Sequence, residues 1–403
     1  MIEPGMRRGI DVVRAGATLW VILFHVQHGI ARFTSGEEAR AFAERLWPVF
    51  NAGWQTYGVD ALFMVSALTL TVSLLSERDR TGRVDLWAFY LRRLGRILPL
   101  YWLAVLVYGL AEGAPAGEIL LSAAFIGFVV SDNNVVPVGW TMEAILIVYI
   151  LLPFVVAGLA RTGRPLLWIA LTCVGTLALR HAYVVAAEED FSHLFLGLLE
   201  TKTPSDAAFE LYFRLWFRVT PFLIGLGAGW LVMRHRERLR DWALGLPGLS
   251  AGLLSLVVLL LLAGWPVADP LAAERGPEWL WETFWAWSGA LFALATAIAV
   301  TVFGYRSPNA DQGGWVGWIS ARIFPIYLFH MPMILIAAVL VFRSTDASVL
   351  ATATNWHVLG LFAVATALSS ALAWPLHRYV EQPVARWLER RSPRRRLVTK
   401  SEL

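Results

Sequence analysis

Long apolar segments separated by short polar loops dominate this chain of 403 residues. An α-helix needs about 20 residues to cross the hydrocarbon core of a bilayer. Apolar segments near or above that length lie at about 10–31, 50–75, 97–112, 138–160, 165–187, 218–233, 243–264, 279–303, 319–342 and 356–377, of which the third and sixth are short. The pattern predicts an all-α integral membrane protein, a polytopic bundle of about ten transmembrane helices.

One further apolar stretch, from Ile119 to Ser131, is too short to cross the bilayer. If it were counted as a span, the charge bias of every later loop would be reversed. We therefore expect a short re-entrant or interfacial segment here. The predicted organisation is one transmembrane domain over residues 1–380 and a basic cytoplasmic tail over residues 381–403.

The loops between the predicted spans differ in charge on the two sides of the membrane. Arginines gather on one side, at Arg78, Arg80, Arg83, Arg92, Arg93, Arg96, Arg161, Arg164, Arg234, Arg236, Arg238, Arg240 and from Arg378 to Lys400. The longest loop on the other side, about 188–217, carries several carboxylates. Because positive residues mark cytoplasmic loops, both termini are predicted to be cytoplasmic, in a multi-pass protein of the cell (plasma) membrane.

Composition narrows the protein class further. Hydrophobic residues make up 57% of the chain and the mean hydropathy is +0.58, more than a soluble core of this length requires. The net charge of +4 would suggest nucleic acid in a soluble protein, but here the basic residues collect at helix ends. Cys173 is the only cysteine, which excludes an intrachain disulfide or a thiolate metal cluster, and no metal site is predicted.

The first span carries an arginine and a histidine, Arg14 and His25, with ten residues between them. At about 100° per residue, eleven steps give three turns plus about 20°, so both lie on one helix face, about 16 Å apart along the axis. Ionisable groups inside a bilayer are costly and usually functional. His25 is the candidate catalytic base, with His28 one turn further out.

Two carboxylates also enter the predicted spans near their outer ends, Asp60 in the second and Glu143 in the fourth. By depth, both can meet His25 in the outer half of the bundle, so both are candidate catalytic residues. The alternative is that each caps a helix or bonds nearby backbone at the interface. The sequence leaves both interpretations open.

An arginine cluster precedes the third span. Arg93 and Arg96 lie one helical turn apart, so both guanidiniums can bind a single polyanion by forked hydrogen bonds. The alternative is an ordinary positive-inside anchor that contacts lipid phosphates. That alternative is weaker for Arg14, which lies within its span.

The segment Phe324-Pro-Ile-Tyr-Leu-Phe-His330-Met-Pro332 places a histidine beside a proline that frees a backbone carbonyl. His330 is therefore either a substrate-binding residue or a partner for that backbone. Trp140, just before Glu143, is a candidate wall of the site. The other tryptophans are expected to form interfacial belts and packing contacts.

Together these segments resemble the membrane-bound acyltransferase 3 family. The resemblance follows the family's order over almost the whole chain, through Arg14 and His25, Gly58-Val-Asp-Ala-Leu-Phe-Met-Val-Ser-Ala67, Arg92-Arg-Leu-Gly-Arg-Ile-Leu-Pro-Leu-Tyr101, Trp140-Thr-Met-Glu143 with Tyr149 and Pro153, Tyr327-Leu-Phe-His330-Met-Pro332 and Tyr379-Val-Glu381-Gln-Pro383. Ala67 replaces the family's usual glycine.

The resemblance implies transfer of an acyl group, by default acetyl, from cytoplasmic acyl-coenzyme A to a hydroxyl of a glycan, glycolipid or glycosylated product. Acyl-coenzyme A is then a donor substrate, with no permanently bound cofactor. Arg14, Arg93 and Arg96 would bind it, and His25 would act as general base or acyl relay. Trp140, Tyr149 and His330 are expected to contact substrate.

The main alternative is a multi-pass secondary transporter of a small solute, because buried charges also line transport pathways. Against it, the hydropathy shows no internal repeat, and a transporter needs no arginine cluster leading to a buried histidine. The expected partners are the bilayer, acyl-coenzyme A and a hydroxyl-bearing acceptor, without nucleic acid. A homodimer, or a separate transferase that completes the reaction, also fits the sequence.

Overall fold

The computed structural model describes residues 2–32, 38, 41–42, 45–51, 56–187, 206–264, 277–309 and 313–391. Within these ranges the chain is helical, without a β-strand. Among the described residues, ten helices are long and apolar enough to cross a membrane, which confirms the predicted number of spans. The chain forms two compact units, each assembled from separate stretches of sequence.

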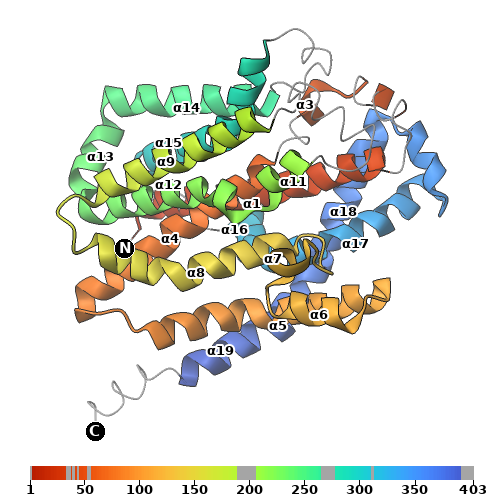
Figure 1. Ribbon diagram of the computed structural model, residues 1–403, viewed down its shortest axis with the longest axis horizontal. Coiled ribbons are helices and arrows are strands. Elements are labelled where there is room, and N and C mark those ends of the chain that lie inside the picture. The colour runs from red at the N-terminus through yellow and green to blue at the C-terminus, as the bar shows by residue number, and fades with distance from the viewer. Residues whose placement is uncertain are drawn as a thin grey trace. The chain divides into compact units, whose positions relative to one another are not determined.

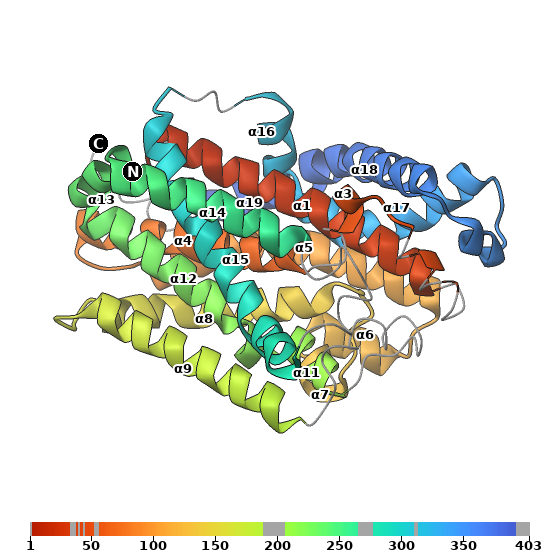
Figure 2. The same ribbon diagram turned by 90° about the horizontal axis from the view of Figure 1, so that it is seen from above.

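Unit 1 comprises residues 1–72, 164–321 and 332–366. Its elements are α1 (Pro4–Arg32), α3 (Pro48–Asn51), most of α4 (Tyr57–Thr81), α9 (Pro165–Ala186), α11 (Asp206–Phe213), α12 (Leu215–Arg234), α13 (Arg236–Leu244), α14 (Leu246–Gly264), α15 (Glu278–Arg306), α16 (Gly314–Ala321), the second part of α17 (Ile323–Phe342), the 3₁₀ turn Ala347–Thr352 and the first half of α18 (Asn355–Leu376). Helix α15 packs against α1, α9, α12 and α14, and α9 runs beside α12 (Figure 1 and Figure 2).

Unit 1 has an apolar core where α1, α4, α12 and α15 meet. Its buried members include Met6, Ile10, Leu68 and Val300. A second cluster joins α1 to the first turn of α4, where the ring of Tyr57 stacks on Phe292 with centroids 4.7 Å apart. This second cluster fixes the start of α4 beside the middle of α1, and so sets the frame for the polar residues of both helices.

Unit 2 comprises residues 73–163, 322–331 and 367–403. It contains the end of α4, α5 (Leu86–Glu112), α6 (Ala116–Ala123), α7 (Gly127–Ser131), α8 (Gly139–Leu159), the first part of α17, the end of α18, a π-helical turn (His377–Glu381) and α19 (Gln382–Arg391). Helix α5 is the centre of this unit, and α6, α8 and α19 pack against it.

Helix α5 is longer than its apolar sequence suggested. The Asp85 side chain caps it by accepting the backbone N–H of Ala88 at 2.9 Å, and Gly113 ends it in the left-handed conformation at φ 63°. The third span, predicted over 97–112, is therefore the second part of a 27-residue helix. The three arginines that lowered its hydropathy lie on its first turns.

The short apolar stretch at 119–131 forms parts of α6 and α7, which have eight and five residues and are too short to cross a bilayer. Helix α6 folds back along α5 (Figure 1). The Tyr101 hydroxyl donates to the Ser122 carbonyl at 3.1 Å, and Trp102 Nε1 donates to the Ala123 carbonyl at 3.1 Å. Tyr101 lies eleven residues before the end of α5, so α6 returns by about 16 Å along it. These contacts favour the re-entrant interpretation over the interfacial one.

Two predicted polar segments are only partly described. Residues 382–391 of the predicted basic tail form α19, whereas residues 392–403 lie outside the described residues. In the predicted acidic loop at about 188–217, residues 188–205 lie outside them as well, and α11 follows from Asp206.

Candidate functional site

Arg14 and His25 both lie on α1, as the spacing predicted. Arg14 is half-buried in unit 1. Its Nη1 lies 4.0 Å from Asp11 Oδ1 on the same helix, and its Nη2 lies 3.5 Å from Thr69 Oγ1 on α4. Asp11 also accepts a hydrogen bond from Ser320 Oγ at 2.5 Å. The guanidinium of Arg14 is thus directed by α1 itself and by α4.

His25 is held by its own helix. Its Nδ1 lies 2.9 Å from the carbonyl oxygen of Val21, one turn earlier. A carbonyl can only accept a hydrogen bond, so Nδ1 carries the proton, and in the neutral ring Nε2 is the basic nitrogen. The Phe24 ring packs edge-on to the imidazole, with centroids 5.0 Å apart. The backbone therefore selects the tautomer that a base acting through Nε2 requires.

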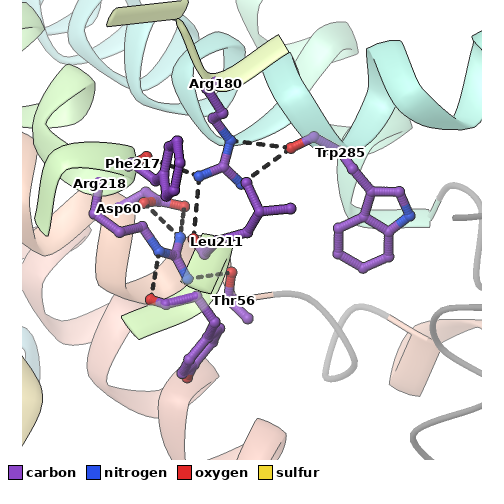
Figure 3. Close-up of polar contacts among 8 residues, drawn as sticks. Thr56, Asp60, Arg180, Leu211, Phe217, Arg218 and Trp285 are labelled. Carbon is purple, nitrogen blue, oxygen red and sulfur yellow. Dashed lines mark hydrogen bonds and ion pairs between the residues drawn. The ribbon is translucent and has the colours of Figure 1, made fainter. Parts of the chain in front are cut away.

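Asp60 is buried in the first turn of α4 and forms an ion pair with an arginine of α12 (Figure 3). Arg218 Nη1 donates to both carboxylate oxygens, at 2.9 and 3.1 Å. Its Nη2 donates to Thr56 Oγ1 at 3.2 Å, and its Nε to the Tyr212 carbonyl at 3.0 Å. These contacts join α4 to α12, whereas the Nδ1 of His25 is bonded to backbone. A catalytic role for Asp60 stays a prediction.

A second buried arginine, Arg180 of α9, lies beside this pair (Figure 3). It donates to three backbone carbonyls, those of Trp285 (3.2 Å from Nε and 3.0 Å from Nη2), Leu211 (3.1 Å) and Phe217 (2.7 Å). These carbonyls belong to α15, α11 and α12. Arg180 therefore ties together the helix ends around Asp60.

Sequence reasoning missed both Arg180 and Arg218, although both lie within predicted spans. The signal was available, because an arginine inside an apolar segment singled out Arg14 in the same way. Arg180 interrupts the run Leu177-Ala-Leu-Arg180-His-Ala-Tyr183. Its carbonyl partners are distant in sequence and could not have been identified without the structure.

Glu143, in unit 2, is buried near the start of α8. Both of its carboxylate oxygens accept the backbone N–H of Phe128 at 3.1 Å, and Oε1 accepts Asn134 Nδ2 at 2.8 Å. Asn134 Nδ2 also lies 2.9 Å from the Tyr101 hydroxyl, which bonds to α6. Glu143 thus belongs to a polar network that links α5, α6, α7 and α8.

The network leaves little room around the first residue of α7. A Cβ added to Gly127 would lie 2.4 Å from the Asn133 carbonyl oxygen and 3.3 Å from Glu143 Oε1. The carboxylate therefore meets the N-terminus of α7 closely, as expected of a capping group. These contacts match the capping interpretation that the sequence left open, and a catalytic role for Glu143 stays a prediction.

The arginine cluster on α5 differs from one residue to the next. Arg92 Nη2 lies 3.3 Å from Glu77 Oε2, and Arg96 Nε donates to Glu381 Oε1 at 3.1 Å. The Arg93 guanidinium lies over the Phe89 ring, 5.7 Å from its centroid, and its buried Nε has no hydrogen-bond partner among the described residues. Within the described chain, Arg93 is the member of this cluster without a carboxylate partner.

The remaining predicted residues also lie in unit 2. Trp140 is buried and Tyr149 half-buried on α8. The Tyr90 hydroxyl donates to the Ile150 carbonyl at 2.9 Å, which sets α8 beside α5 one turn from Arg93. His330 is completely buried on α17, and its Nδ1 lies 2.7 Å from the carbonyl of Tyr327. The carbonyl that Pro332 frees, that of Leu328, accepts instead the Tyr108 hydroxyl at 2.9 Å. His330 is thus bonded to backbone, but not to the carbonyl that the proline frees, and a substrate contact stays a prediction.

The structure therefore distributes the predicted site residues over both units. His25, Arg14 and Asp60 belong to unit 1, and Arg93, Arg96, Glu143, Trp140, Tyr149 and His330 belong to unit 2. Among the residues that the structure describes, no group of three His, Cys, Asp or Glu side chains could hold a metal ion.

Comparison with known proteins identifies the family of the chain. Residues 7–374 match a family, acyltransferase 3, that is described as an acyltransferase domain. The O-acetyltransferase OatA of Staphylococcus aureus strain NCTC 8325 / PS 47 is 30% identical over 102 residues, 25% of this chain and 13% of the relative. A protein of S. aureus strain COL, provisionally named as an O-acetyltransferase, is 32% identical over 106 residues, 26% of this chain and 14% of the relative.

The matched segment thus covers about one seventh of the length of these relatives. No solved structure matches the chain.

Proposed function

Because this chain belongs to the acyltransferase 3 family, we propose that it transfers an acyl group, by default acetyl, from cytoplasmic acyl-coenzyme A to a hydroxyl of a glycan, glycolipid or glycosylated product. The observation that carries the proposal is the state of His25. An imidazole inside a membrane-spanning helix has its Nδ1 committed to the Val21 carbonyl at 2.9 Å, so that Nε2 is the basic nitrogen. An acyl transfer to a hydroxyl requires such a base.

The proton and the acyl group move as follows in direct transfer. The acceptor hydroxyl attacks the thioester carbonyl carbon while Nε2 of His25 takes its proton. The tetrahedral intermediate then collapses, the C–S bond breaks, and the imidazolium returns the proton to the leaving thiolate. The products are an ester and free coenzyme A. The carbonyl of Val21 stabilises the imidazolium in between, because it remains bonded to Nδ1–H.

A relay through the histidine uses the same nitrogen. Here Nε2 attacks the thioester and coenzyme A leaves as a thiolate, while the acyl-imidazolium keeps its Nδ1 proton. The acceptor hydroxyl then attacks the acyl carbon, Nε2 leaves, and the hydroxyl proton goes to the thiolate or to water. Rapid mixing with labelled donor in the absence of acceptor distinguishes the two routes. Only the relay leaves label on the protein.

The donor's phosphates are assigned to Arg93 and Arg96 in this proposal. Guanidiniums bind phosphates through paired N–H groups, more strongly than neutral donors do. Arg93 supports the assignment because the described chain supplies it with no carboxylate. Arg14 is assigned to the thioester arm. Trp140, Tyr149 and His330 are assigned to substrate contacts, and Asp60 and Glu143 to holding the polar surroundings of the site.

The competing function is a secondary transporter of a small solute. A transporter also tolerates buried ionic groups such as Asp60 and Arg218. The two functions can be told apart by coenzyme A release, because only the transferase consumes a thioester.

The acceptor class is tested in cells. Glycans and glycolipids are extracted from cells with and without this chain and compared by mass spectrometry. We expect an added mass of about 42 Da per acetyl group, lost on mild alkaline treatment that cleaves esters. Identical mass profiles in both extracts would contradict a glycan or glycolipid acceptor.

A further inference from the structure

A π-helical turn, His377–Glu381, interrupts the passage from α18 to α19 and buries a carboxylate against α5. Glu381 is only 3% exposed. Its Oε1 accepts Arg96 Nε at 3.1 Å, and its Oε2 lies 2.8 Å from His377 Nδ1. Single π turns are rare and are often found at functional sites. His377 and Glu381 lie four residues apart, so both face the same side of the turn.

The second partner of Glu381 is the ring of His377. A carboxylate can only accept, so His377 Nδ1 carries a proton and donates it to Glu381. The other ring nitrogen, Nε2, lies 2.9 Å from Gln382 Nε2, which holds the ring from its far side. In the described chain, Arg96 is the arginine that pairs with Glu381.

Glu381 holds Arg96 by one edge only. The contact is with Nε, and the described chain gives the two terminal Nη nitrogens no hydrogen bond. The side chain of Arg96 is 47% exposed, against 5% for that of Glu381. A phosphate commonly binds a guanidinium through two parallel N–H···O bonds, and the pair of Nη nitrogens can supply both. The carboxylate thus fixes the Nε side of the guanidinium and leaves the two Nη nitrogens accessible.

Helix α19 keeps this arrangement close to α5. A Cβ on Gly95 would lie 2.3 Å from Leu388 Cδ1, so the two helices touch beside Arg96. Figure 1 shows α19 lying along the first half of α5. The position of Glu381 relative to Arg96 is therefore set by helix packing as well as by the ion pair.

We propose that Glu381, supported by His377, is a positioning residue that presents the Nη fork of Arg96 to a phosphate of the acyl-coenzyme A donor. The proposal rests on the donor role of Arg96 in the proposed function. The opposite role would be a placeholder anion that the donor displaces. A placeholder would occupy the fork, whereas Glu381 occupies Nε. The two roles also predict opposite signs, because removing a placeholder tightens donor binding.

The test uses the full chain in lipid nanodiscs and two donors, acetyl-coenzyme A and S-acetylpantetheine. The second donor carries the thioester arm without the nucleotide and its phosphates. We expect Glu381→Ala to raise the KM for acetyl-coenzyme A about tenfold, with kcat within about twofold and an unchanged KM for S-acetylpantetheine. Glu381→Gln, whose amide oxygen can still accept from Arg96 Nε, should raise it less.

Two further variants make the result specific. Arg96→Ala should raise the KM for acetyl-coenzyme A, and adding Glu381→Ala to it should raise that KM no further. Glu77→Gln, which alters another buried carboxylate paired with an arginine of α5, should leave both donor KM values unchanged. If Glu381→Ala fails to fold, the comparison of Glu381→Gln with wild type carries the same test.

The outcomes distinguish the positioning role of Glu381 from the donor-binding role of Arg96 on which it rests. If Arg96→Ala raises the donor KM but the Glu381 variants leave it unchanged or lower it, the positioning role is wrong and the donor role stands. An equal rise with both donors would also overturn the positioning role. If Arg96→Ala has no effect on the KM for acetyl-coenzyme A, Arg96 does not bind the donor and both assignments fall.

Discussion

His25 and His28 make the same contact with α1. The Nδ1 of each ring lies 2.9 Å from the carbonyl oxygen four residues earlier, that of Val21 or Phe24. The two histidines therefore lie on the same helix, three residues apart, and have the same tautomer. Their surroundings differ. His28 stacks on Phe24, with ring centroids 3.9 Å apart, whereas Phe24 meets His25 edge-on. This makes His28 a closely matched control for His25.

Replacing His25 by alanine should lower acyl transfer by at least about 100-fold, because a general base contributes roughly that factor or more. Membrane insertion should persist, since alanine is easier to insert than histidine. His28→Ala removes an equivalent ring and should retain most activity. Activity is measured as ester formation by protein purified at equal yield. Near-normal transfer by His25→Ala would exclude it as base or relay.

The arginines of α5 make a separate prediction about binding. Arg93→Ala and Arg96→Ala should each raise the KM for acyl-coenzyme A more than they change the KM for the acceptor. Arg80→Ala is the control, because Arg80 is exposed and its Nε donates to the Ser76 carbonyl of its own helix. If the donor KM is unchanged in both α5 variants, the two arginines serve as a positive-inside anchor and do not bind the donor.

For single residues, the sequence predicted the place of a side chain on its helix better than the groups that the side chain contacts. The shared helix face of Arg14 and His25 follows from helix periodicity, which the sequence contains. The partner of Asp60 is Arg218, 158 residues away, and no local pattern reveals such a distance. The three carbonyls that accept from Arg180 could not be predicted from the sequence either, because every residue has a backbone carbonyl.

At the level of the elements, the long apolar segments located the ten spans but placed several boundaries poorly. The start of α5 is set by the Asp85 cap, a polar signal within an arginine-rich segment that a hydropathy pattern discounts. The division of residues 116–131 into α6 and α7 depends on a turn in which Phe125 adopts φ 60°. A bulky residue rarely takes that conformation, so the sequence alone argues against the turn that forms.

The joint between α4 and α12 gives an element-scale prediction. Arg218→Met leaves the Asp60 carboxylate buried without its charge partner, which costs about 3 kcal/mol or more. We expect a lower midpoint of thermal unfolding in detergent. The double variant Asp60→Leu with Arg218→Met should recover much of the loss, because both charges of the pair are removed together. If Arg218→Met melts like wild type, the ion pair does not hold these helices.

The start of α7 gives a second prediction about the packing of elements. Gly127→Ala introduces a Cβ 2.4 Å from the Asn133 carbonyl oxygen, so backbone must shift and the contacts with Glu143 must loosen. We expect a loss of about 1–3 kcal/mol in stability. Gly117→Ala in α6 is the matched control, since its Cβ would meet nothing within 4 Å. Equal stability of the two variants would contradict the close packing around Glu143.

At the scale of the whole molecule, the charge of the loops predicts the sidedness of the reaction. If the arginine-rich loops are cytoplasmic, the N- and C-termini lie on the same face as Arg93 and Arg96. In sealed vesicles of known orientation, acyl-coenzyme A should support transfer only when added to the face that bears the termini. Equal transfer from either face, or labelling that places residues 188–217 on the same face as the termini, would overturn this topology.

Consumption of a thioester distinguishes a transferase from a transporter, and it is measured as coenzyme A release by the purified protein. Free thiol is followed with a thiol reagent after acetyl-coenzyme A is added to the full chain in nanodiscs, with and without extracted glycan or glycolipid. We predict release that rises with acceptor and falls at least about 100-fold in His25→Ala. Release that is absent in the wild type with every acceptor class, or equal in the two proteins, would contradict the proposed acyl transfer.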